Sequence, residues 1–145
     1  EFKDFGASVQ ALRDSSKAEN VGVFASGHMV TKPTTKEAEE YYHHLVYEMG
    51  DWEAGEHAAT IRTKGRDTPL KQLTTLTERM ISGVGTYPVI GSYDDVVEQY
   101  RKMSECGVDG IAIGLVNYIT DFPVLRDEIL PRMERLGLRL PVSES

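Results

Sequence analysis

Three basic side chains stand at alternate positions of one polar stretch, residues 51–67: Arg62, Lys64 and Arg66. Helical periodicity fades over this stretch, and an irregular segment of this length in a compact domain is commonly a lid or a disordered loop. Cations on a lid reach a site as it closes and water leaves, and there they stabilise an anionic group. The plainer reading is that all three are solvated charges. We predict a lid over residues 51–67, with these cations as the candidate catalytic residues.

Two apolar stretches end in side chains that could bind a ligand. Residues 21–30 carry Met29 near their end, and residues 111–118 finish on Asn117 and Tyr118. Neither stretch alternates with polar residues, which is typical of parallel strands buried on both faces. The Asn117 amide could hydrogen-bond a ligand, and the Tyr118 ring could stack on it or wall its pocket. Alternatively, Asn117 caps a turn and Tyr118 is a core aromatic.

The histidines and the cysteine do not have the spacing of a metal site. His43 and His44 are adjacent on a helix, so that their rings point to different sides, and no carboxylate stands at ligand spacing from them. His28 lies near the end of the first strand candidate. Cys106 follows a helix and precedes a glycine, a position more typical of a small buried filler than of a nucleophile. We therefore predict no metal site.

Helix signals surround the strand candidates. Thr34 with Glu37 forms a capping box at one helix start, and Ser92 with Asp95 forms another. Residues 86–90 are a marginal third strand. The sequence therefore predicts an α/β fold with two or three parallel strands and flanking helices. A sheet this small leaves both edges open, so we expect it to be part of a larger sheet, joined covalently or by association.

The composition narrows the class of protein. The chain has 145 residues, 40% hydrophobic and 27% charged, as in an ordinary globular domain. Its net charge of −7 opposes nucleic-acid binding, because an acidic surface repels phosphates. A single cysteine suits a reducing compartment, and no apolar run reaches the ~18 residues of a membrane span. We expect a cytoplasmic protein that binds neither nucleic acid nor membrane. Because residue 1 is not Met, we also expect a longer parent chain.

Four peptides, taken in order, resemble one family: residues 32–39 (KPTTKEAE), 83–92 (GVGTYPVIGS), 107–112 (GVDGIA) and 117–133, which begin NY and contain FPVLRDEILPRM. From about residue 21 to residue 139, the chain resembles the C-terminal part of the bacterial luciferase-like, flavin-dependent monooxygenases. It is most similar to their sulfone and alkanesulfonate two-component branch. Where many members read Gly-Gly-Tyr-Pro, this chain has Thr86 at the second position, which places a side chain where a flavin would approach bare backbone.

The resemblance implies a TIM-like (β/α)8 barrel, of which residues 1–145 form one C-terminal segment. Residues 21–30 would be the seventh strand, residues 111–118 the eighth, and residues 51–67 part of a mobile insertion over the active site. It also implies reduced FMN, supplied by a partner flavin reductase and held by a phosphate-binding loop upstream of this chain. Asn117, Tyr118 and Met29 would then contact the cofactor.

Two functions follow from these observations. In the first, the chain is part of an enzyme that inserts one oxygen atom from O2 into a small organic substrate, and the isolated segment is inactive. In the second, it is a non-catalytic α/β module that associates with copies of itself and so buries its open sheet edges. Both readings predict a homo-oligomer or a larger assembly.

Overall fold

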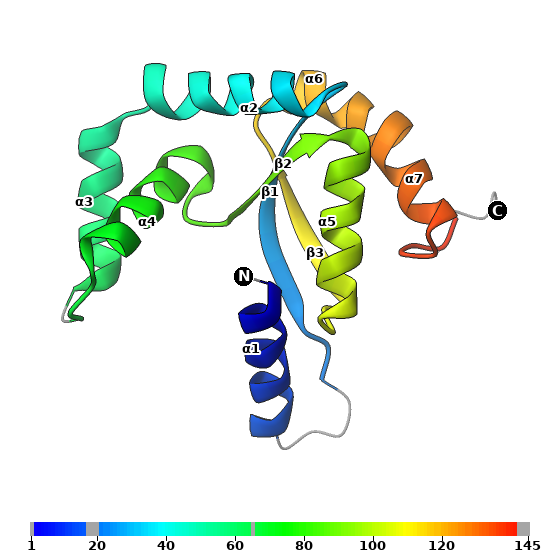
Figure 1. Cartoon of the computed structure of the whole chain (residues 1–145), viewed down its shortest axis with the longest axis horizontal. Coiled ribbons are helices and arrows are strands. Elements are labelled where there is room, and N and C mark those ends of the chain that lie inside the picture. The colour runs from blue at the N-terminus through cyan, green and yellow to red at the C-terminus, as the bar shows by residue number, and fades with distance from the viewer. Residues whose placement is uncertain (1, 17–20, 65, 142–145) are drawn as a thin grey trace.

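The computed structural model describes residues 2–16, 21–64 and 66–141 and contains one three-stranded parallel sheet. In spatial order the strands are β2 (Tyr87–Ser92), β1 (Phe24–Lys32) and β3 (Gly110–Leu115). The predicted α/β class, the parallel strands and the marginal third strand are all confirmed. Figure 1 shows β1 between its two neighbours, with helices around the sheet.

The two outer strands pair with overlapping parts of the nine-residue strand β1, one nearer its start and one nearer its end. β3 pairs with its first six residues, from Phe24 opposite Gly110 to Met29 opposite Leu115. β2 pairs with its last six, ending at Lys32 opposite Ser92. β1 and β3 are thus direct neighbours, as two consecutive strands of a barrel are, and β2 lies on the opposite edge of β1.

One face of the sheet carries the main hydrophobic core. It packs against α1 (Phe2–Ser15), α5 (Tyr93–Glu105), the π-helical turn η2 (Leu125–Ile129) and α7 (Leu130–Arg135). The buried members of this core come from every one of these layers: Val9, Met29, Val89, Val96, Val97, Tyr100, Met103, Val108, Ile129 and Met133. The short helix α6 (Tyr118–Val124) connects β3 to η2.

The other face of the sheet is only partly covered. Towards its carboxyl end, where α2 and α4 pack on β1, His28 and Val30 are buried. Towards its amino end, the side chain of Phe24 is 74% exposed, and Ser26 and Ala112 are exposed as well. Within the described residues, half of this face therefore has no packing partner.

The segment between β1 and β2 is helical almost throughout. It contains α2 (Thr35–His43), the π-helical turn η1 (His44–Glu48), α3 (Trp52–Thr63) and α4 (Leu70–Gly83). Figure 1 shows α3 and α4 side by side, away from α5 and α7. Both predicted capping boxes are present, at Thr34 before α2 and at Ser92 before α5.

The predicted irregular loop over residues 51–67 is wrong, because α3 occupies most of it. The Asp51 side chain accepts a hydrogen bond from the backbone N–H of Ala54 and caps the helix. The buried positions of α3 are Gly55 and Ala59, and Gly55 packs directly against Ile81 of α4. Small residues let two helices approach closely, but they leave no large apolar stripe in the sequence.

Candidate functional site

The carboxyl ends of the three strands meet at one edge of the sheet, from which the chain continues into α2, α5 and α6. In barrels of parallel strands, ligand-binding and catalytic residues gather at this edge. Figure 1 shows α2 and α6 lying at the same end of the sheet. The side chains that these two helices and the strand ends bring there are the candidate site residues.

Asn117 is the N-cap of α6. Its Oδ1 accepts hydrogen bonds from the backbone N–H groups of Ile119, at 3.0 Å, and Thr120, at 3.4 Å. Its own backbone N–H donates to Asp121 Oδ2 at 2.9 Å. The capping interpretation is therefore correct for the side-chain oxygen. The nitrogen of the Asn117 side-chain amide takes no part in this capping, and it can still donate a hydrogen bond to a ligand.

Tyr118 is not a core aromatic. Its side chain is 67% exposed, and it begins an apolar patch that continues with Ile119, 87% exposed, and Phe122, 53% exposed. Large apolar side chains gathered on a surface at a strand end are a common feature of ligand and partner sites. The alternative that placed Tyr118 in the core is wrong, and its ring is accessible for stacking.

Met29 lies in the hydrophobic core, with 1% of its surface exposed. It projects from β1 to the side covered by α5 and η2, together with Val89 and Val96. A contact between Met29 and a cofactor would require this core to open. The sequence could not show this, because an apolar strand without alternation does not reveal which residues face which side.

Three further side chains stand at this edge, and the sequence analysis did not single them out. Lys32, the last residue of β1, holds its Nζ 4.1 Å above the centre of the Tyr41 ring on α2. Burial, and then the negative charge of Asp121, raise the pKa of Tyr41, which keeps its phenol protonated. Lys32, Tyr41 and Asp121 thus join Asn117 in one polar cluster, and Tyr118 follows Asn117 in the chain. In the sequence, the feature that could have indicated Lys32 as a site residue is its position at the end of a strand.

The three predicted cations do not lie together at this edge. Arg62, in the last turn of α3, donates from Nη1 to the carbonyl oxygen of Val84 at 3.4 Å. Lys64 and Arg66 are exposed in the connection between α3 and α4. Figure 1 shows this connection at the end of the helix pair away from α2. Among the residues that the structure describes, no carboxylate pairs with any of the three.

His28 is 4% exposed and connects β1 to the turn after α4. Its Nδ1 lies 2.9 Å from Thr86 Oγ1, and Thr86 Oγ1 donates to the Gly83 carbonyl at 2.7 Å. Nε2 is buried, and no residue that the structure describes forms a hydrogen bond with it. Burial, followed by the positive charge of Arg79, lowers the pKa of His28, so that the imidazole is neutral. Thr86, at the position where many members of the family that the sequence resembles have glycine, therefore makes a structural contact with His28.

Within the described part of the chain, no three His, Cys, Asp or Glu side chains are placed to hold a metal ion. The statement that no carboxylate stands at ligand spacing from the paired histidines is wrong, because Glu48 lies four residues after His44 and contacts both rings. His44 Nδ1 lies 2.7 Å and His43 Nδ1 3.6 Å from the carboxylate of Glu48. The widened turn η1 brings these side chains together on the surface. No described helix is both long enough and apolar enough to cross a membrane.

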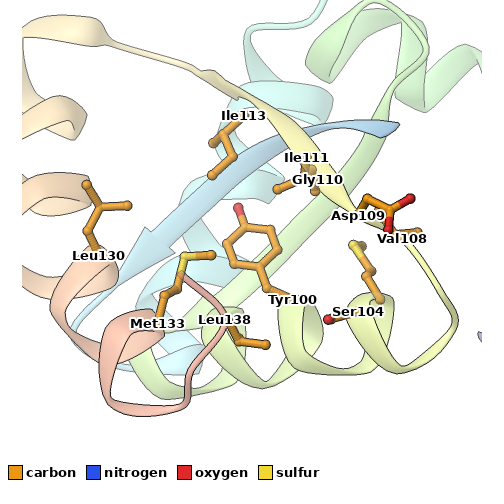
Figure 2. Close-up of a pocket in the computed structure, with 11 residues that line it drawn as sticks. Tyr100, Ser104, Val108, Asp109, Gly110, Ile111, Ile113, Leu130, Met133 and Leu138 are labelled. Carbon is orange, nitrogen blue, oxygen red and sulfur yellow. The ribbon is translucent and has the colours of Figure 1, made fainter. Parts of the chain in front are cut away.

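A cavity of about 240 Å³ lies on the face of the sheet that carries the main core, between β3, α5 and α7. Figure 2 shows Tyr100 in its middle, with Ile113, Leu130, Met133 and Leu138 around it. Burial raises the pKa of Tyr100, so its phenol stays protonated. The lining of the cavity includes Asp109 and Gly110, where β3 begins, and extends along the strand to Ile113.

Two solved structures share this fold. A crystal structure of riboflavin lyase (RcaE) with modified FMN and the substrate riboflavin has 16% sequence identity and a TM-score of 0.70, over 94% of this chain and 37% of that chain. A crystal structure of long-chain alkane monooxygenase (LadA) has 18% identity and a TM-score of 0.64, over 99% of this chain and 36% of that chain. Both are bacterial luciferase-like proteins with TIM-barrel folds, which confirms the resemblance at the level of the fold.

The chain spans little more than a third of either structure, and so it has the fold of part of such a barrel. No family model matches the chain. No curated protein matches its sequence.

Proposed function

We propose that this chain is the C-terminal part of a luciferase-like, flavin-dependent monooxygenase that inserts one oxygen atom from O2 into a small organic substrate. The observation that carries the proposal is the parallel β1–β3 pair with its helices, which matches part of two flavin-related barrels at TM-scores of 0.70 and 0.64. Among such enzymes, we favour the two-component branch, in which a partner reductase supplies reduced FMN.

The residues at the carboxyl edge fit a flavin. A planar ring system with polar edges needs an apolar surface on one side and hydrogen-bond donors around it. The exposed patch of Tyr118, Ile119 and Phe122 provides the first, and the Asn117 amide nitrogen provides a donor beside it. The bound flavin would supply the redox chemistry, and this chain would orient it and exclude water.

The partly uncovered face of the sheet supports the proposal that this chain is part of a larger barrel. The bare amino half of one face, with Phe24, Ser26 and Ala112 exposed, is what barrel strands show when the strands opposite them are absent. The expected phosphate-binding loop and most catalytic groups would lie in those missing parts. We therefore predict that the 145-residue chain has no oxygenase activity and binds FMN weakly or not at all.

The experiment compares the 145-residue chain with a longer protein that contains it, using quenching of flavin fluorescence. The longer protein should bind FMN, and Asn117→Ala and Tyr118→Ala should each weaken that binding about tenfold. Tyr47→Ala, which removes an exposed tyrosine of η1, should leave it unchanged. Micromolar FMN binding by the 145-residue chain, or equal affinity in all variants, would show that this site assignment is wrong.

A separate observation favours the second candidate function, a self-associating α/β module. Within the described residues, the outer edge of β3 and the bare half of the sheet have no partner, and two copies could cover them. Size-exclusion chromatography with light scattering separates the two functions. A stable dimer of the 145-residue chain with a sharp unfolding transition favours the module, whereas weak and polydisperse association favours the incomplete barrel.

A further inference from the structure

The cavity between β3, α5 and α7 is lined mainly by apolar side chains, among them Ile111, Ile113, Leu130, Met133 and Leu138. The polar side chains of its lining are those of Tyr100, Ser104 and Asp109, and the last two are exposed at the surface. Among the described residues that line the cavity, none is Lys, Arg or His. A concave, mostly apolar space with few polar groups is typical of sites for small organic molecules.

The hydroxyl group of Tyr100 faces this cavity without a protein acceptor. The residue is 4% exposed, and Figure 2 shows its ring in the middle of the cavity with the hydroxyl directed towards β3. No residue that the structure describes forms a hydrogen bond with this hydroxyl. Burial raises the pKa of Tyr100, so the phenol keeps its proton and can donate it to an acceptor. Because an unpaired buried hydroxyl is unfavourable, a ligand that brings an acceptor would be favoured here.

The size and the lining of the cavity suit an organic molecule better than water. A buried water needs about two to four polar partners, and among the buried and half-buried side chains of this lining only Tyr100 offers one. An apolar cavity of ~150 Å³ stays dry and binds benzene. A volume of about 240 Å³ therefore has room for a molecule of about ten non-hydrogen atoms.

We propose that this cavity binds a small uncharged carbonyl compound, such as an aromatic ketone, whose oxygen accepts a hydrogen bond from the Tyr100 hydroxyl. A carbonyl oxygen brings no donor of its own, whereas the O–H group of an alcohol would itself need an acceptor. A carboxylate or a phosphate would be buried beside a lining without a cation, which is strongly unfavourable. The lining contains no residue of the polar cluster, so this proposal does not depend on the flavin assignment.

The test is a titration of the 145-residue chain with acetophenone and with α-methylstyrene, followed by the methyl resonances of its Met and Ile residues. The two probes have the same shape, but α-methylstyrene has a CH2 group in place of the carbonyl oxygen. Acetophenone should give saturable shifts at Ile111, Ile113 and Met133, which line the cavity. Met49 and Ile119 are exposed and lie outside the lining, and they should show no saturable shift.

Tyr100→Phe isolates the hydrogen bond, because it keeps the ring and removes only the hydroxyl. It should weaken the binding of acetophenone about three- to tenfold and that of α-methylstyrene less than about twofold. Without a ligand, this variant should be at least as stable to heat as the unmodified chain, since the hydroxyl has no partner among the described residues. A less stable variant would mean that the hydroxyl already has an acceptor in the protein, which contradicts the proposal.

Leu138→Phe tests the position of the site, because the larger side chain would occupy part of the cavity. Both probes should then bind at least several-fold more weakly. Leu136→Phe makes the same enlargement at an exposed position outside the lining and should leave binding unchanged. Thermal unfolding checks that each variant folds, and Tyr100→Phe decides alone if Leu138→Phe does not. The proposal is overturned if no lining methyl group gives a saturable shift, if Tyr100→Phe weakens both probes equally, or if the two leucine variants bind alike.

Discussion

The Nδ1 atom of His28 lies 2.9 Å from the hydroxyl oxygen of Thr86, and this contact fixes the tautomer of a buried imidazole. Since Thr86 donates its hydroxyl hydrogen to the Gly83 carbonyl, its oxygen accepts from His28, and Nδ1 carries the ring proton. Nε2 is then a bare acceptor. One hydroxyl thereby connects the central strand of the sheet to the last residue of α4.

Thr86→Val tests the energetic value of this connection. Valine keeps the shape of the side chain but cannot accept a hydrogen bond, so the N–H of His28 is left buried without a partner. We expect a loss of about 1–3 kcal/mol in the free energy of unfolding, measured by urea denaturation. Thr75→Val is the matched control, since its hydroxyl donates to a backbone carbonyl on the exposed face of α4. Equal losses in the two variants would show that the Thr86 contact contributes nothing specific.

The pH dependence of stability should carry a contribution from His28. Burial and Arg79 lower its pKa in the folded state from 6.5, so that between the two pKa values the unfolded chain binds a proton that the folded chain does not. Stability from this group is complete above pH 6.5 and falls as the pH decreases towards the folded-state pKa. The slope should approach, but not exceed, ~1.4 kcal/mol per pH unit for this one group.

Urea unfolding measured at intervals from pH 7.5 to pH 5 checks this expectation. His28→Gln removes the titrating group, and its stability should fall less steeply over the same range, whatever its absolute stability. His57→Gln, at an exposed position of α3, should keep the original slope. A slope for His28→Gln that equals that of the unmodified chain would remove His28 as its source.

Much of the fold could be predicted because its signals are local. The strands follow from unbroken apolar runs, and the starts of α2 and α5 follow from capping boxes whose partners are three residues apart. Helix α3 could not be predicted in this way, since its buried positions are Gly55 and Ala59. Close approach between helices requires small side chains, and these leave no hydrophobic period in the sequence.

The candidate site could be predicted only in part, because its remaining members depend on contacts between distant segments. Asn117 and Tyr118 follow from their place at a strand end. The stacking of Lys32 on Tyr41 requires α2 to fold back over the sheet, and the effect of Asp121 on Tyr41 requires α6 to lie near α2. The burial of Met29 could not be predicted, because the helices that cover the sheet decide which face of a strand is buried under them.

Val84→Asn should stabilise the protein. A left-handed conformation costs an L residue about 1–2 kcal/mol, and asparagine tolerates it better than a β-branched residue does. The Val84 side chain is 76% exposed, so that little packing is lost. We expect a gain of about 0.5–1 kcal/mol in the free energy of unfolding. Val84→Ala, which keeps a Cβ atom without branching, should give a smaller gain. A loss of stability in Val84→Asn would mean that the turn is not strained at this residue.

Two glycine-to-alanine substitutions in helices should have opposite effects. At Gly83, an added Cβ would overlap Nδ1 and Cγ of the buried His28 ring, and at 4% exposure this ring has no free space to enter. Gly83→Ala should therefore cost about 1–3 kcal/mol, as overpacking does. At Gly6 in α1, the nearest atoms to an added Cβ belong to Cys106 at 3.7 Å, an ordinary contact. Gly6→Ala should then gain up to ~1 kcal/mol from helix propensity.

The pair is informative because both substitutions add the same methyl group to a helical glycine, so that propensity alone predicts a gain at both positions. Only the packing of α4 against the His28 ring predicts a loss at Gly83. Urea unfolding of the two variants under identical conditions decides between the two effects. If Gly83→Ala is as stable as Gly6→Ala, the end of α4 does not lie on the His28 ring in solution, and the turn that follows α4 is not packed as the structure has it.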